Sequence, residues 1–71
     1  MAHRQHRLAR VTVALFNEAE GFVVGQLPGD VTISFDPDDL LLKSRMLVDV
    51  TWEDKSILMF ASDLKHFAVP E

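Results

Sequence analysis

The 71-residue chain contains no cysteine and no tyrosine, and it has a single tryptophan. Without cysteine the protein has neither a disulfide nor a thiolate-bound metal site. This absence fits a reducing compartment, so we expect a cytoplasmic protein. The sequence also lacks an apolar run of the roughly 20 residues that a membrane-spanning helix needs, so we expect no membrane partner.

Basic residues are scarce outside the start of the chain. Arg4, Arg7 and Arg10 lie within residues 1–10, which contain no acid, whereas residues 11–71 hold the other four basic residues and all eleven acidic ones. We interpret residues 1–9 as a flexible basic arm and residues 10–71 as a single small domain. The acidic body repels phosphate backbones, but an arm carrying these three arginines is able to reach nucleic acid.

Alternation of apolar and polar residues with a period of two predicts a mainly β fold. The predicted strands cover residues 10–16, 22–27, 31–35, 57–61 and 67–69. Proline and glycine at positions 28 and 29 predict a tight turn that joins the second and third of these strands in a hairpin. In that hairpin Phe22 faces Phe35 and Val24 faces Ile33, so the apolar faces coincide.

The segment from 36 to 52 allows two interpretations. Asp36 and Pro37 are typical of a capped helix start, and a helix over 38–46 is one alternative. The alternation from Leu40 to Trp52 favours the other, a long bent strand, and a helical turn near 37–41 is compatible with both. A polar turn over 53–56 then closes a hairpin in which Trp52 faces Ile57.

The strand over 57–61 is apolar on both faces. Ile57 and Met59 point to the core in the predicted hairpin, so Leu58 and Phe60 point the other way. Something should cover that outer side, and in so short a chain the cover is another subunit or the N-terminal arm. Leu47, which interrupts the polar face of the preceding strand, joins Leu58 and Phe60 as the candidate interface.

The segment 52–69 resembles the end of SH3-like barrels, in which a hairpin is followed by a short helical turn and a closing strand. The matching parts are the turn over 53–56, the strand over 57–61, the turn over 62–65 and the strand over 67–69. The resemblance implies a small five- to six-stranded SH3-like barrel with one short helical turn near 63–66. It does not imply binding of proline-rich peptides, because that activity uses surface tyrosines and this chain has none.

A weaker resemblance is to Sm-like proteins, whose small bent barrels assemble into rings through edge strands. The segments that follow their order are 11–15, 25–27, 40–43 and 57–61. The loop over 16–22 is longer than in that family, and the body of the chain is acidic. This resemblance implies a tendency to assemble and nothing about RNA.

Three groups of polar residues are candidates for chemistry: His3 with His6; Asp36 and Asp38 with Asp39; and Ser62 and Asp63 with His66. The histidine pair has no third ligand nearby, and the aspartates lack the glycine and distal glutamate of a calcium loop. The last group is typical of a helix cap rather than of a catalytic triad. We therefore expect no enzyme activity, no metal and no cofactor.

The single tryptophan and three apolar residues beside loops are further candidates for contact with a partner. We place Trp52 in the core or at a subunit interface, and Phe16, Phe22 and Leu27 at an exposed apolar rim. The sequence thus predicts a non-enzymatic interaction module that forms a homo-oligomer or binds a protein partner. The alternative is a nucleic-acid-binding protein that uses its basic arm.

Overall fold

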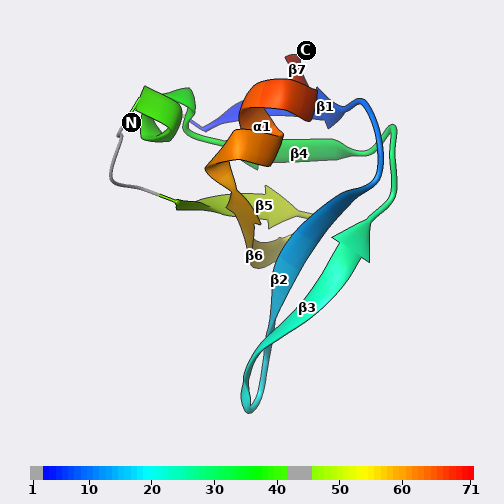
Figure 1. Ribbon diagram of the computed structural model, residues 1–71, viewed down its shortest axis with the longest axis vertical. Helices are drawn as coiled ribbons and strands as arrows, with labels where there is room; N and C mark the ends of the chain where they lie inside the picture. The colour runs from blue at the N-terminus through cyan, green and yellow to red at the C-terminus, as the bar shows by residue number, and fades with distance from the viewer. Residues whose placement is uncertain (1–2, 42–45) are drawn as a thin grey trace.

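The computed structural model describes residues 3–41 and 46–71. The strands within these residues are β1 (Arg4–Leu8), β2 (Thr12–Glu18), β3 (Gly21–Leu27), β4 (Thr32–Phe35), β5 (Leu47–Trp52), β6 (Lys55–Phe60) and β7 (Ala68–Pro70). The helices are the 3₁₀ helix η1 (Pro37–Leu41) and α1 (Ala61–Phe67). The prediction of a mainly β fold with short helical segments is confirmed (Figure 1).

The seven strands form one antiparallel sheet in the order β3-β2-β6-β5-β4-β1-β7. Among the described residues β3 and β7 are its two edges and do not pair with each other, so the sheet is not closed into a barrel. The β2–β3 hairpin explains the difference from the predicted five- to six-stranded barrel. It projects away from the body of the protein, which carries β3 away from β7 (Figure 1).

The prediction of a flexible arm is wrong over Arg4–Leu8, because these residues form β1. This strand pairs with β4 on one side and with β7 on the other. His6 and Leu8 are 6% and 0% exposed, and they alternate with exposed neighbours. The segment is therefore an amphipathic strand in which Gln5 and Arg7 lie on the solvent side, while Arg4 is exposed at its start.

The predicted hairpin between residues 22–27 and 31–35 is also wrong. β3 pairs with β2, and β4 pairs with β1 and β5. The turn at 28–30 instead carries the chain across to β1, where Leu8 donates its N–H to the Val31 carbonyl and accepts a hydrogen bond from the Asp30 N–H. The strand β1, which the sequence did not predict, thus takes the place beside β4 that was predicted for β3.

The hairpin between β5 and β6 forms two residues out of the predicted register. Glu53 and Asp54 have φ values of 49° and 63° and make a two-residue turn, so that Trp52 pairs with Lys55 and Val50 with Ile57. Positive φ at both central residues is the pattern of a type I′ turn. Because side chains alternate with a period of two, this shift leaves every side chain on its predicted face.

The helical segments resolve part of the ambiguity after residue 36. The helical turn near 37–41 is confirmed, with the Asp38 N–H donating to Asp36 Oδ1 at 3.0 Å. The long strand is wrong at Leu40 and Leu41, which belong to η1, and positions 42–45 lie outside the described residues. The turn near 63–66 lies within α1, whose N-cap is Phe60 rather than Ser62.

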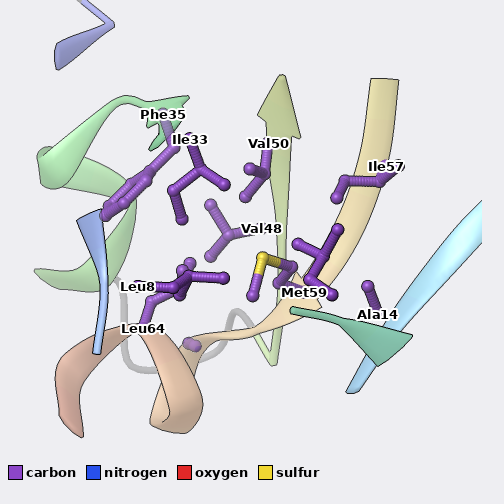
Figure 2. Packing of buried hydrophobic residues seen from close by; sticks show 11 residues of the cluster. Leu8, Ala14, Ile33, Phe35, Val48, Val50, Ile57, Met59 and Leu64 are labelled. Carbon is purple, nitrogen blue, oxygen red and sulfur yellow. The ribbon is translucent and has the colours of Figure 1, made fainter. Parts of the chain in front are cut away.

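The core lies on one face of the curled sheet, where α1 closes it. Its fully buried members come from seven elements: Leu8, Ala14, Leu27, Ile33, Phe35, Val48, Val50, Ile57, Met59 and Leu64. In Figure 2, Leu64 of α1 lies next to Leu8 of β1, and Val48 and Met59 of the same cluster lie to the right of them in the view. We call this side of the sheet the inner face.

Candidate interaction surface

Strand β2 carries apolar side chains on both faces of the sheet. Thr12 and Ala14 point to the core and are 5% and 0% exposed. Val13 and Leu15 point the other way, and Val13 is 36% exposed. The more apolar of the two faces is therefore the one that turns away from the core.

The strand registers align these outward side chains across four strands. Leu15 of β2 lies opposite Val24 of β3 and also opposite Leu58 of β6. One row further on, Leu47 of β5 lies opposite Phe60 of β6. We define the outer apolar face as Val13, Leu15, Phe22, Val24, Leu47, Leu58 and Phe60.

The outer apolar face is open to solvent in the single chain. Phe22 is 54% exposed, Val24 69% and Phe60 38%. Leu15, Leu47 and Leu58 are half-buried by their neighbours, and Val13 is 36% exposed. The three residues predicted as an interface, Leu47, Leu58 and Phe60, thus lie together on this face.

Sequence reasoning missed the contribution of the β2–β3 hairpin to this surface. The signal was present, because Val13 and Leu15 alternate with Ala14 and Phe16 and leave neither face of the strand polar. A strand with two apolar faces is typical of a sheet that is covered on both sides. The wrong partner predicted for β3 hid the match, since Phe22 and Val24 were placed opposite β4.

Charge is sparse on the outer side of β3, β2, β6 and β5. Asp49, which lies opposite Leu58, is the charged side chain that these four strands place there. β3 itself contains no charged residue along its length. A protein of net charge −4 thus has a nearly neutral apolar surface on this side.

Two predicted rim residues and the tryptophan lie on the inner side. Leu27 is fully buried, so its placement at an exposed rim is wrong, whereas Phe22 is exposed. Phe16 is half-buried and meets Trp52 edge to face at 6.2 Å. Trp52 packs against the core cluster, in line with the core position predicted for it.

The three arginines do not form a separate arm. Arg7 makes an ion pair of 2.8 Å with Asp30, and Arg10 lies 5.2 Å from the centre of the Phe67 ring. Arg4 is an exposed residue of β1. The nucleic-acid alternative therefore loses the mobile basic segment on which it depended.

The candidates for chemistry lie apart or have local partners. His6 stacks on Phe35 at 4.3 Å, and its Nδ1 lies 3.0 Å from the carbonyl oxygen of Arg4. The carbonyl oxygen of Ser62 accepts a hydrogen bond from His66 Nδ1 at 2.7 Å, which turns that ring toward its own helix. In residues 3–41 and 46–71 no three His, Asp or Glu side chains gather closely enough to hold a metal ion.

No helix in the described part of the chain has the length and apolar character to cross a membrane. Comparison with protein-family models, with curated proteins and with solved structures finds no match to this chain. The outer apolar face is the surface feature on which the functional proposal rests.

Proposed function

We propose that this protein is a non-enzymatic interaction module that binds a second copy of itself through the outer apolar face. The observation that carries the proposal is the row of apolar side chains on the side of β2 and β6 opposite the core. Sheets whose two faces are both apolar are normally covered on both sides. Contiguous exposed apolar patches on small proteins mark protein contact sites.

Two further observations support a second copy as the occupant. Asp49 is the one acidic residue that β2, β3, β5 and β6 place on this side, so two copies can meet there with little repulsion between like charges. Sheets also pack face to face at about 10 Å through branched and aromatic side chains, which are the kinds present on this face.

The test is the solution mass of Phe60→Asp, measured by light scattering on a sizing column over a range of concentrations. Phe60 is 38% exposed and serves as the N-cap of α1, a position where aspartate is favoured, so the variant should fold. We expect the wild-type protein to be larger than a monomer and the variant to shift toward the monomer.

Val69→Asp is the matched control. Val69 is 42% exposed and lies on β7, at the opposite edge of the sheet from β3. It introduces the same charge at nearly the same exposure, and we expect its mass to equal that of the wild type. A wild-type mass that is monomeric at every concentration, or a Phe60→Asp mass that does not change, would overturn the proposal.

A further inference from the structure

We propose that the free edge of β3 pairs with β3 of a second copy, antiparallel and about a two-fold axis at Val23. The pairing places two outer apolar faces side by side in one continuous sheet. The inference deepens the proposed function, because it states how the surface used for self-association is enlarged. It rests on the proposed function for the use of that surface, but the edge contact itself is tested separately.

The two edges of the sheet differ in protection. Edge strands are ordinarily blocked by charged side chains, by proline or by being very short. β7 has only three residues, includes Pro70 and is followed by Glu71. β3 has seven residues, none of them charged and none of them proline.

The side chains of β3 are apolar on both of its faces. Phe22 and Val24 belong to the outer apolar face, and Val23, at 52% exposed, points to the other side. Three consecutive exposed apolar residues on an unpaired edge are a template for another strand. A foreign strand would need a matching sequence, whereas a second copy supplies one.

The choice of register follows from matching side chains across the axis. With Val23 opposite Val23 of the second copy, Phe22 lies opposite Val24 of that copy, and Gly21 lies opposite Gly25. Centring on Val24 instead would place Phe22 opposite the polar Gln26. Cross-strand pairs between aromatic and β-branched residues are favourable, so the first register is preferred.

Electrostatic repulsion between two copies is low at the β3 edge. Each copy carries a net charge of −4, so copies repel each other at most relative orientations. An antiparallel pairing of β3 brings only neutral residues into direct contact. It therefore adds no pair of like charges across the strands.

The outer apolar face of one copy is smaller than the area that a stable protein interface buries. The face covers four strands and at most about three residues of each, so its projected area is about 200 Å² at about 4.8 Å between strands and about 3.3 Å per residue. A stable interface buries about 800 Å² on each partner. Edge pairing doubles the continuous face, and two such pairs packed face to face would bury all four outer faces.

Disulfide trapping tests the edge contact, because the chain has no native cysteine. The variant Val23→Cys is oxidised with copper phenanthroline at micromolar protein concentration, and the covalent dimer is followed on a non-reducing gel. Val69→Cys, on the β7 edge, is the matched control. We expect the dimer to form at least about tenfold faster in Val23→Cys, because pairing about the axis holds the two thiols at a high effective concentration.

Equal rates in the two variants, or faster trapping of Val69→Cys, would overturn the edge contact. A second variant, Val23→Lys, places two charges on the axis without altering the outer apolar face, and we expect it to lower the solution mass. A mass unchanged from the wild type would also contradict the pairing.

Combining Val23→Cys with Phe60→Asp separates the two proposals. Trapping that persists in the double variant supports the edge contact independently of the outer face. If trapping is no faster than in Val69→Cys while Phe60→Asp alone still lowers the mass, the edge contact is wrong and the proposed function stands. If trapping is fast while Phe60→Asp leaves the mass unchanged, the edge contact stands and the proposed function is wrong.

Discussion

The ring of Phe16 lies directly over Gly25 of the neighbouring strand. A Cβ atom built on Gly25 would be 2.7 Å from Phe16 Cε1, which is closer than two carbon atoms approach without displacement. The same ring meets Trp52 edge to face, so it is held from a second side. Gly25 thus allows an aromatic side chain on β2 to cover the backbone of β3, where the β2–β3 hairpin leaves the core.

Gly25→Ala should lower the free energy of unfolding by about 1–3 kcal/mol, because the added methyl group forces the Phe16 ring out of its place. Urea denaturation followed by circular dichroism measures the change. The matched experiment makes the same substitution in a Phe16→Leu background, where the smaller side chain relieves the clash. A loss of equal size in both backgrounds would show that Phe16 is not the cause.

Thr12 provides a test of the buried inner face of β2. Its side chain is 5% exposed, and its Oγ1 has no hydrogen-bond partner among the described residues. Thr12→Val keeps the shape and removes an unsatisfied hydroxyl, so the free energy of unfolding should rise by about 1 kcal/mol.

Thr32→Val is the control for this substitution. The Thr32 hydroxyl is exposed and donates to Glu71 Oε1 at 2.8 Å, so its removal should change stability by less than about 0.5 kcal/mol, and not upward. Thermal unfolding of both variants by differential scanning calorimetry measures the difference. A Thr12→Val protein less stable than the wild type would mean that the hydroxyl has a partner in solution.

The sequence predicts element type better than pairing in this fold. Alternation located five of the seven strands to within about two residues at most ends, because side-chain burial with a period of two is a local property. Pairing depends on which strands are available. The turn at Pro28-Gly29 and the coinciding apolar faces predict a hairpin of β3 with β4, whereas the actual partners of β4 are β5 and β1, a segment predicted to be an arm. Arg4, Arg7 and Arg10 favour an arm, although His6 and Leu8 alternate with polar residues in the same short segment.

The candidate surface was predicted only in part for the same reason. Leu58 and Phe60 could be placed outward from the alternation of a single strand. Val13, Phe22 and Val24 belong to the same surface only through the pairing of β2 with both β3 and β6. A surface that extends over four strands is a property of topology, which one sequence specifies weakly.

Deletion of residues 1–9 tests the role of β1 as a structural strand. The deletion removes one of the two partners of β4 and the partner of β7, and it takes away Leu8, which is fully buried. We expect the shortened chain to lose its cooperative thermal transition, because a small domain has little stability to spare. Retention of a sharp transition near the wild-type temperature would contradict this role.

Arg7→Ala separates the charge of this segment from its strand pairing. The ion pair with Asp30 joins side chains that are 50% and 78% exposed. Exposed ion pairs contribute little, so the variant should lose less than about 1 kcal/mol and keep its cooperative transition. A loss as severe as that of the deletion would mean that the guanidinium, and not the strand, holds β1 in the sheet.

Phe60 lies both on the outer apolar face and at the N-cap of α1. Its backbone is extended, with φ −69° and ψ 133°, and no side chain caps the helix. Serine at this position should accept a hydrogen bond from the first turn of α1, whereas alanine cannot. Both remove the same aromatic ring, so Phe60→Ser should be about 1 kcal/mol more stable than Phe60→Ala in urea denaturation of the monomeric protein.

If phenylalanine is kept at a cap position at the expense of helix stability, the two variants should also lower the solution mass alike. Equal stability of the two variants would show that α1 gains nothing from a cap, and Phe60 would then carry no cost for its place on the outer apolar face.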